Sequence, residues 1–159
     1  MRKVLHILEK DGTLTPEQIA VMLGRTAESV EADIEKARAA GALLGTRAVV
    51  DWEKAGSDYV TAMIEVRIAP QRGEGFDRVA ERIYQFDEVQ SLYLMSGGYD
   101  LHVVITGRSL REVALFVSEK LAALESVTGT TTHFLLKKYK ESGVMYSPRH
   151  ENQERVTFL

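Results

Sequence analysis

The spacing of apolar residues along this chain of 159 residues changes once, near residue 59, and this change constrains the fold more than any other feature. Before it, apolar residues recur at intervals of three and four, which is the period of an amphipathic helix. From Val60 to Ile68 they occupy every second position instead, which is the period of a half-buried strand. We therefore expect an all-helical N-terminal domain followed by a domain of mixed secondary structure.

Three short helices are expected within the first 41 residues. The first presents a one-sided apolar stripe and ends at Asp11-Gly12. The second starts at Thr15-Pro16-Glu17-Gln18, where Thr15 is suited to cap the helix and Gln18 to return a bond to the cap residue. The third is capped by Thr26 and ends at Ala40-Gly41. The apolar stripes of the three helices are Val4, Leu5 and Leu8, then Ile19, Ala20 and Leu23, then Val30, Ile34 and Ala37.

The second and third helices are joined by a short turn that contains Gly24, which is the pattern of a helix-turn-helix. Residues 43–50 then read as a short strand or hairpin, so the sequence predicts a winged helix-turn-helix over residues 1–50. Residues 51–58 are mostly polar and are predicted to be a linker.

The second domain is predicted over residues 59–138. Strands are expected at 60–68, 89–96, 99–107 and 127–136, and Gly97-Gly98 suits a tight hairpin between the second and third. One helix follows Phe76, and another starts at the capping box Ser109-Leu110-Arg111-Glu112. The order strand, helix, strand, strand, helix, strand predicts a ferredoxin-like β-α-β-β-α-β sandwich, and the whole chain belongs to the α+β class. The two helical stripes are Phe76, Val79, Ala80 and Ile83, and Val113, Phe116, Val117, Leu121 and Leu124.

Residues 139–159 are predicted to be a polar C-terminal tail with two apolar patches, 144–146 and 156–159. Most tails of this kind are frayed. The alternative is that one patch pairs with an edge of the sheet, in this subunit or in a partner, because an open sheet has edges to cover.

Composition excludes several classes of function. The chain has no cysteine, so it has no disulfide, no thiolate metal site and no cysteine nucleophile. No apolar run approaches the roughly 20 residues of a membrane span, and charged residues come too early for a signal peptide, so we expect a cytoplasmic protein. Phosphate-loop and nucleophile-elbow motifs are absent. We expect no enzyme, no cofactor and no metal, since the histidines lack metal-ligand spacing; they are His6, His102, His133 and His150.

Charge is distributed without a strongly basic region. Residues 1–50 contain seven basic and seven acidic side chains, residues 51–136 eight and thirteen, and residues 137–159 five and three. Any binding of DNA must therefore depend on local placement of charge and on the association of several subunits.

The order of these two domains, together with the motif Ser96-Gly97-Gly98-Tyr99-Asp100-Leu101 and the threonine-rich segment Val127 to Thr132, resembles the leucine-responsive regulator (Lrp/AsnC) family of bacterial and archaeal transcription factors. The resemblance covers residues 1 to about 140. It implies a DNA-binding transcriptional regulator that responds to a small-molecule effector, most simply an amino acid. It also implies a homodimer that assembles into higher oligomers on double-stranded DNA.

In proteins similar to this one, residues near the start of the third helix reach base edges in the major groove. The matching positions are Arg25, Thr26, Ala27, Glu28, Ser29 and Ala32. Thr26 and Ser29 can bond bases or phosphates, whereas the acids Glu28, Glu31, Asp33 and Glu35 are unusual for such a helix. We interpret Glu31, Asp33 and Glu35 as a solvated face. The residues predicted to contact DNA are Arg25, Thr26, Glu28, Ser29, Lys36, Arg38 and Arg47.

The same resemblance implies an effector near the second hairpin, between dimers of a larger ring. Two glycines allow the backbone to approach a ligand, and Asp100 can pair with an ammonium group. The alternatives are that the glycines are simply a turn, that the threonines are simply strand formers, and that Asp100 makes a turn-flanking or intersubunit hydrogen bond. The predicted effector-binding residues are Met95, Gly97, Gly98, Tyr99, Asp100, Thr130 and Thr132.

Two other functions remain possible from the sequence. One is a metabolite-binding oligomer with weak or lost DNA binding, which the acidic third helix favours. The other is an enzyme, because siroheme decarboxylases resemble this family in fold, although no cluster of Arg and His marks a porphyrin pocket here.

Overall fold

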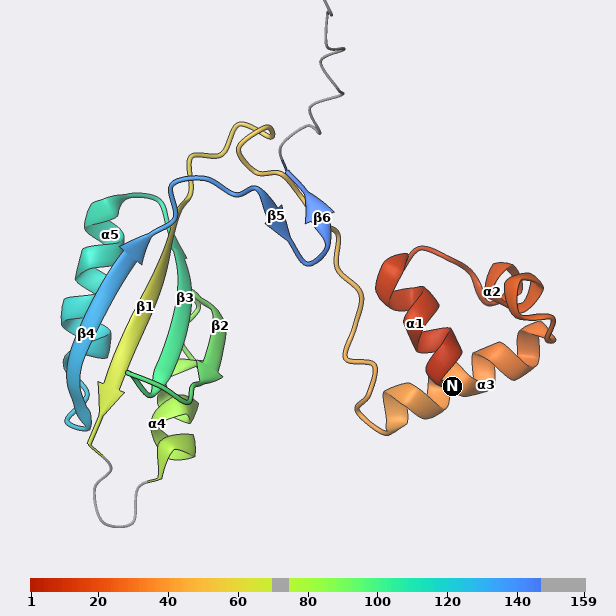
Figure 1. Ribbon diagram of the computed structural model, residues 1–159, viewed down its shortest axis with the longest axis horizontal. Coiled ribbons are helices and arrows are strands. Elements are labelled where there is room, and N and C mark those ends of the chain that lie inside the picture. The colour runs from red at the N-terminus through yellow and green to blue at the C-terminus, as the bar shows by residue number, and fades with distance from the viewer. Residues whose placement is uncertain (70–74, 147–159) are drawn as a thin grey trace, which may run out of the picture. The chain divides into compact units, whose positions relative to one another are not determined.

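Three helices bury the small core of the N-terminal unit, residues 1–49. The computed structural model of the chain, which describes residues 1–69 and 75–146, places them at α1 (Arg2–Lys10), α2 (Pro16–Leu23) and α3 (Ala27–Ala39) (Figure 1). The predicted capping box is present, since Thr15 Oγ1 accepts from Gln18 N at 3.3 Å and Gln18 Oε1 accepts from Thr15 N at 2.9 Å. Val4, Ile19, Ala20, Val30 and Ile34 form the buried core of this unit.

The predicted wing is not confirmed by this structure. Residues 43–50 contain no strand. A strand forms only where its backbone pairs with a neighbour, and in the described ranges 1–69 and 75–146 no segment pairs with these residues. Leu43 N instead donates to the carbonyl of Ala37, which closes the end of α3, and the Leu44 side chain is 94% exposed. In this unit the structure thus shows the helix-turn-helix and no strand over residues 43–50.

A four-stranded antiparallel sheet and two helical segments form the second unit, residues 50–159. The strands are β1 (Val60–Ile68), β2 (Val89–Leu94), β3 (Leu101–Gly107) and β4 (Val127–Phe134), in the spatial order β2-β3-β1-β4. The helices are α4 (Phe76–Ile83) and α5 (Leu110–Leu115), which continues as the π-helix η1 (Phe116–Leu121). This is the topology of the predicted ferredoxin-like domain.

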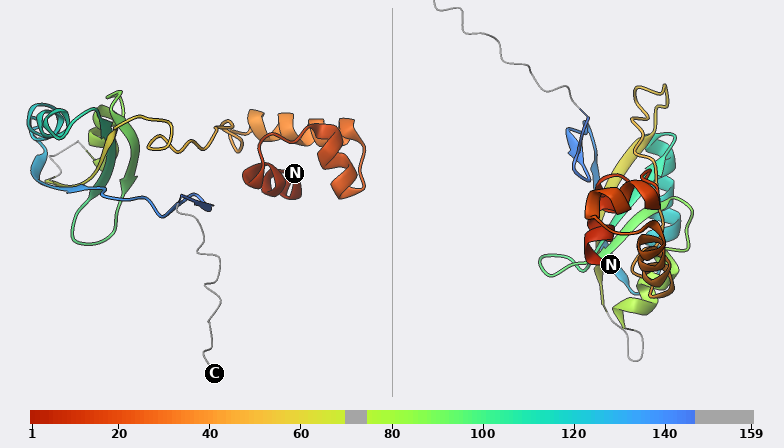
Figure 2. Two further views of the ribbon diagram at one scale, coloured as in Figure 1. Left: turned by 90° about the horizontal axis from the view of Figure 1, so that it is seen from above. Right: turned by 90° about the vertical axis from the view of Figure 1, so that its right-hand side faces the viewer.

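Both helices lie on one face of the sheet, as Figures 1 and 2 show from different sides. Their apolar side chains pack with alternate residues of β1 and β3, including Ile64, Val66 and Val103, which are fully buried. The intervening side chains point to the opposite face, which no helix of the described part of this unit covers. On β1 and β3 this open face presents Thr61, Met63, Glu65, Arg67, His102, Val104 and Thr106.

The pairings of the two edge strands differ from the central pairing. The register of β1 with β4 shifts between Arg67 and Ile68, and that of β2 with β3 shifts between Val89 and Ser91. The central pair, β1 with β3, runs without a shift from Val60 to Val66. Each edge strand therefore carries a local irregularity of the β-bulge type.

One of the two apolar patches predicted in the tail forms a hairpin of its own. Val144–Met145 (β6) pairs with Lys140–Glu141 (β5) and not with an edge of the main sheet of this subunit. Ser142 and Gly143 have φ angles of 47° and 84°, and two consecutive positive values suit a two-residue hairpin turn. Residues 156–159, the other patch, lie outside the described residues. No helix in the described ranges is both long and apolar enough to cross a bilayer.

An ion pair beside the π-helix gives the second unit a pH dependence. Lys120 Nζ lies 5.0 Å from the ring centre of Phe86 and 5.5 Å from that of Phe116, and it donates to Glu88 Oε1. This hydrogen bond lowers the pKa of Glu88 below its ordinary value of 4.5. A carboxyl whose pKa is lower in the folded chain stabilises the fold above its unfolded pKa, and this contribution is lost as the pH falls through the folded value.

We therefore expect the melting temperature of the wild type to fall more steeply below about pH 4.5 than that of Glu88→Gln. The matched control is Glu119→Gln, since Glu119 is exposed on the same π-helix. Circular dichroism melts between pH 7 and pH 3 measure the difference. Parallel curves for wild type and Glu88→Gln would show that the pair contributes nothing.

Candidate functional site

The α2–α3 turn brings four of the seven predicted DNA-contacting residues together at the start of α3, namely Arg25, Thr26, Glu28 and Ser29. Gly24 ends α2 in the left-handed conformation, with φ 61° and ψ 40°, and only two residues then separate it from α3. Thr26 caps α3 by accepting from Ser29 N at 3.3 Å. Because Val30, Ile34 and Ala37 are buried, the opposite side of α3 is exposed, and it presents Glu28, Ala32, Glu35 and Lys36.

Arg25 is engaged with α3 itself. Its Nη1 donates to Asp33 Oδ2 at 2.7 Å, and its Nε donates to Ser29 Oγ at 3.2 Å. Its Nη2 donates to the carbonyl of Ser29 at 2.9 Å and also to Ser29 Oγ. The guanidinium predicted to bind phosphate is therefore already bonded to its own helix.

The interpretation of Asp33 as part of a solvated face is wrong. Its side chain is only 20% exposed, because it accepts from Arg25 and from the N-terminal ammonium group of Met1. The hydrogen bond from the N-terminal ammonium, and then that from Arg25, lowers the pKa of Asp33. Glu31 is exposed, as interpreted, and exposed Glu35 accepts from Arg38 Nη1 at 2.6 Å.

The remaining cations of this unit are exposed. Lys36 lies on the outward side of α3, and Arg38 pairs with Glu35 near its end. Arg47 lies in the segment that forms no strand. Exposed cations of this kind can contact phosphates without reading sequence.

In the second unit, the predicted effector residues of the β2–β3 connection form a four-residue loop. Met95 N donates to the carbonyl of Asp100 at 2.8 Å, so residues 96–99 lie between the closing pair. The turn is therefore longer than the tight hairpin predicted at Gly97-Gly98. A Cβ built on Gly98 would meet no other residue within 4 Å, and its φ is not positive, so the fold itself does not require glycine there.

Asp100 is bonded to the central strand. Its Oδ2 accepts from Ile68 N at 2.7 Å, and its backbone N donates to the carbonyl of Val66 at 3.0 Å. The hydrogen-bonding alternative considered for Asp100 is thus present within one chain. A carboxylate has about four acceptor positions, so this half-buried group retains the capacity to accept from an ammonium group.

Tyr99 contacts a residue that the sequence did not indicate. Its hydroxyl lies 3.3 Å from Nδ1 of His102, and the Tyr93 ring lies 6.4 Å from the His102 ring. His102 faces the open side of the sheet, opposite Glu65 of β1. Sequence analysis considered this histidine only as a metal ligand, and among the residues that the structure describes no group of three potential ligands is found.

The predicted threonines lie on β4, which pairs with β1 along the edge opposite to β3. Thr130 is opposite Val66 and Thr132 opposite Ile64, so both point to the helix-covered face. Thr130 and Asp100 therefore flank the same residue, Val66, from β4 and from the β2–β3 loop. Thr130 also lines a small pocket of about 120 Å³ with Gly129 and with Glu65, Arg67 and Thr131, whose side chains belong to the open face.

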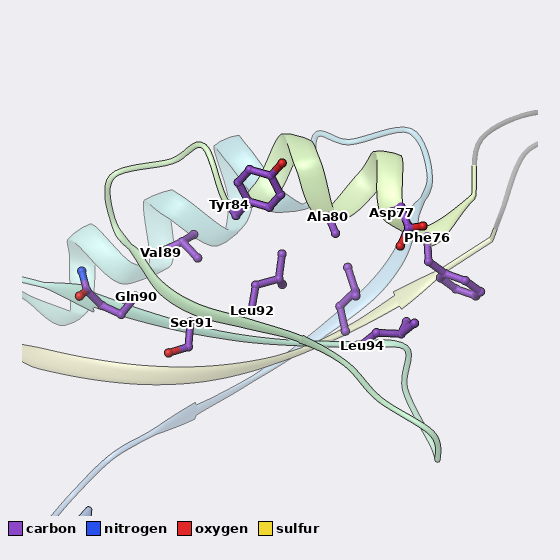
Figure 3. A pocket seen from close by; sticks show the side chains of 10 residues that line it. Phe76, Asp77, Ala80, Tyr84, Val89, Gln90, Ser91, Leu92 and Leu94 are labelled. Atoms are coloured by element: carbon purple, nitrogen blue, oxygen red, sulfur yellow. The ribbon is translucent and has the colours of Figure 1, made fainter. Parts of the chain in front are cut away.

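A larger cavity of about 400 Å³ lies between α4 and the edge strand β2 (Figure 3). Sequence analysis missed it, because Phe76 and Ala80 were assigned to a packed helical stripe. Figure 3 shows the Leu92 side chain pointing from β2 toward α4, and Leu94 also lines the cavity. Leu94 directly precedes Met95, so the cavity begins where the β2–β3 loop leaves β2.

The chain is similar in sequence and in fold to known proteins. The sequence profile described as the Lrp/AsnC ligand binding domain matches residues 61–145. An uncharacterized HTH-type transcriptional regulator, YugG of Bacillus subtilis, is 47% identical over 97% of this chain and 93% of its own. The structure of Escherichia coli AsnC aligns with a TM-score of 0.70 at 21% identity, over 88% of this chain and 92% of that one. The feast or famine regulatory protein of M. tuberculosis, complexed with L-methionine, aligns with a TM-score of 0.73 at 19% identity over 88% and 92%.

Proposed function

Because the chain belongs to the Lrp/AsnC family of transcriptional regulators, we propose that it binds DNA through α3 and responds to an amino acid at the loop of residues 95–100. The observation that carries the DNA-binding half is the α2–α3 pair, in which a two-residue separation after Gly24 leaves the outward side of α3 exposed. A helix presented in this way fits the major groove of B-form DNA. The protein then acts as a regulator in the cytoplasm and not as an enzyme.

The open face of the sheet supports self-association. No helix of the described part of this unit covers this face of the sheet. The face presents Met63, Val104 and Tyr93 between polar residues. Tyr93 is 54% exposed in the single chain. Two copies that bury these faces against each other place two α3 helices on one DNA molecule, which is the arrangement that symmetric operators require. Further association of dimers would then bridge or wrap DNA.

The loop of residues 95–100 supports the effector-binding half of the proposal. Asp100 provides a carboxylate for an ammonium group, and Gly98 leaves the backbone open to approach. Related proteins of this fold have been crystallised with L-methionine. An amino acid at this loop changes DNA binding only if it binds one assembly more tightly than another.

Fluorescence anisotropy tests both parts of the proposal, DNA binding and the response to an amino acid. A labelled fragment from the upstream region of the gene itself is titrated with full-length protein at two salt concentrations, with and without a pool of amino acids. We expect salt-dependent binding that favours this fragment over a scrambled one, and a shift of the curve by the pool. Absence of binding at low salt would contradict the DNA-binding half, and an unchanged curve with the pool would contradict the effector half.

A metabolite-binding oligomer without DNA binding is the second candidate. The observation that favours it is the exposure of Glu28, Glu31 and Glu35 on α3, since acids near a phosphate backbone repel it. This candidate predicts that the amino-acid pool shifts sedimentation while no DNA fragment binds. No observation on the described residues favours the siroheme-decarboxylase alternative.

Substitution of Lys36 tests whether its side chain contacts the phosphates of bound DNA. We expect Lys36→Ala to weaken binding to operator and scrambled DNA by about the same factor, and to reduce the slope of log affinity against log salt by about one. Lys140→Ala, which removes a cation from the β5–β6 hairpin, is the matched control. Equal slopes for wild type and Lys36→Ala in anisotropy titrations would place Lys36 away from the DNA.

A further inference from the structure

Two opposite charges lie close together on the open face of the sheet without pairing. Glu65 and Arg67 are two residues apart on β1, so their side chains point to the same face. The Glu65 carboxylate contacts His133, whose Nε2 lies 3.3 Å from Oε1. Within residues 1–69 and 75–146 the Arg67 guanidinium makes no ion pair or hydrogen bond. A carboxylate has about four acceptor positions, so both groups can still take a partner from outside the chain.

Both charged residues line the pocket of about 120 Å³ between β1 and β4. Thr131 lies opposite Glu65, and Gly129 lies opposite Arg67. Pockets for drug-sized ligands measure roughly 300–1,000 Å³. This pocket therefore admits only a small group.

Gly129 is a glycine that the fold itself does not require. Its φ is not positive, and a Cβ built on it would meet no other residue of the described chain within 4 Å. The register shift at Arg67/Ile68 lies beside it, but a bulge needs glycine only where φ is positive. Glycine inside a strand weakens the strand, and it marks places where a ligand or another backbone approaches closely. The space beside Gly129 is thus open to a ligand.

The two ends of an α-amino acid match this arrangement. Its ammonium group pairs with a carboxylate, and its carboxylate pairs with a guanidinium through two parallel hydrogen bonds. Residues two apart on a strand are separated by roughly 6.7 Å, so Glu65 and Arg67 can contact opposite ends of one small zwitterion. A ligand with a single charge would leave one of the two side chains unpaired.

We propose that this pocket is a second amino-acid site, separate from the loop of residues 95–100, which binds the main-chain ends of a small α-amino acid. Glu65 accepts from the ammonium group, Arg67 donates to the carboxylate, and Gly129 leaves room for the α-carbon. The side chain of the ligand points away from the sheet. The site itself does not depend on the proposed function.

The effect of this site on self-association does rest on the proposed function. When two copies bury the open face against each other, Arg67 leaves water, and an unpaired charge is costly to bury. A bound amino acid gives this charge a partner. Adding the ligand therefore lowers the dissociation constant of the assembly.

Equilibrium dialysis of the full-length chain with radiolabelled L-alanine tests the site. It is carried out in the Asp100→Asn background, so that the proposed loop site does not contribute. The competitors are L-alaninamide, which lacks the carboxylate, and N-acetyl-L-alanine, which lacks the ammonium group. We expect each competitor to bind about 30-fold more weakly than L-alanine. Equal competition by either one would contradict recognition of a zwitterion.

Two glycine variants form a matched pair. Gly129→Ala adds a methyl group in the pocket, and Gly98→Ala adds the same group in the β2–β3 loop, where a Cβ also meets nothing within 4 Å. We expect Gly129→Ala to weaken L-alanine binding roughly tenfold or more without lowering the melting temperature. Gly98→Ala is expected to change neither. A lower melting temperature with unchanged binding would make Gly129 a structural residue and overturn the proposal.

Glu65→Gln and Arg67→Gln test the two charges separately. Each is expected to weaken L-alanine binding about 30-fold. Only Arg67→Gln should also lose the preference over L-alaninamide, and only Glu65→Gln the preference over N-acetyl-L-alanine. Arg111→Gln, which removes an exposed cation from α5, is the charge control. His133→Gln removes the neighbour of Glu65 and is expected to leave the affinity unchanged.

The outcomes separate this inference from the proposed function. If L-alanine does not bind, or binds Gly129→Ala as tightly as its parent, the pocket is not an amino-acid site and the proposal is overturned. DNA binding and the loop site are measured on the wild type and are unaffected by that result. If L-alanine binds but leaves the wild-type dissociation constant unchanged in sedimentation, the link to self-association is overturned. If the wild type does not self-associate, the proposed function loses its assembly, while the dialysis result still decides the site.

Discussion

Ile19→Asp is expected to unfold the N-terminal unit and to abolish DNA binding, while the second unit stays folded and self-associated. Ile19 is fully buried in a small core, a cluster of five buried residues with partly buried apolar residues packed against it. A carboxylate at this position loses the apolar burial and also places an unpaired charge inside the core, so the cost exceeds about 4 kcal/mol. A unit of this size has a small free energy of unfolding, because small domains bury a small fraction of their surface.

Two measurements check this result. Circular dichroism is expected to show the loss of the helical signal of one unit, with the melting transition of the other preserved, because the two units have separate apolar cores. Analytical ultracentrifugation is expected to give the wild-type oligomer. Val21→Asp on the same helix is the control, since the Val21 side chain is 84% exposed. Loss of the oligomer in Ile19→Asp alone would mean that the N-terminal unit also contributes to assembly.

The second large effect is expected from Asp100→Asn, which should reduce the affinity for the amino-acid effector about 30-fold and leave the fold intact. Asparagine keeps a side-chain oxygen that can accept from Ile68 N, and this hydrogen bond connects the loop of residues 95–100 to β1. It removes the negative charge that the proposed ammonium group requires, and a hydrogen bond to a charged group contributes about 2 kcal/mol. Isothermal titration calorimetry measures the affinity, first with L-methionine and then with the other amino acids.

Asp100→Ala separates the two roles of this carboxylate. It removes the acceptor for Ile68 N as well as the charge, so we expect a lower melting temperature in addition to the lost affinity. Asp87→Asn is the control, because Asp87 is an exposed acid before β2. Unchanged affinity in Asp100→Asn, combined with a melting temperature lowered only in Asp100→Ala, would leave Asp100 with a structural role alone.

Much of the fold could be predicted because it is encoded locally. The caps at Thr15, Thr26 and Ser109 accept from the backbone amides that the sequence indicated. The alternating run from Val60 to Ile68 became the central strand β1, because a strand with a buried face needs a period of two. The wing failed because pairing is not local, since residues 43–50 carry strand-forming side chains but have no partner strand in the described chain. The hairpin at Ser142-Gly143 was missed, although the dipeptide is a turn signal.

The candidate sites were less predictable, because they depend on contacts between elements. Sequence analysis assigned Arg25 to contact with DNA and Asp33 to a solvated face of the third helix, and it did not pair them. Asp33 lies eight positions after Arg25, which precedes α3, so the ion pair follows no i to i+4 rule. The contact of Tyr99 with His102 and the flanking of Val66 by Asp100 and Thr130 likewise appear only when the strands are paired.

The irregular register of both edge strands has a consequence for the solubility of the protein. A flat edge offers unpaired backbone groups on which further chains can stack into fibrils. A bulge increases the local twist of a strand, and the shifts at Arg67/Ile68 and at Val89/Ser91 place one such irregularity in the pairing of each outer strand. These irregularities discourage open-ended polymerisation along the sheet. The self-association that we propose would then form through side-chain surfaces of the sheet and not by the addition of strands at its edges.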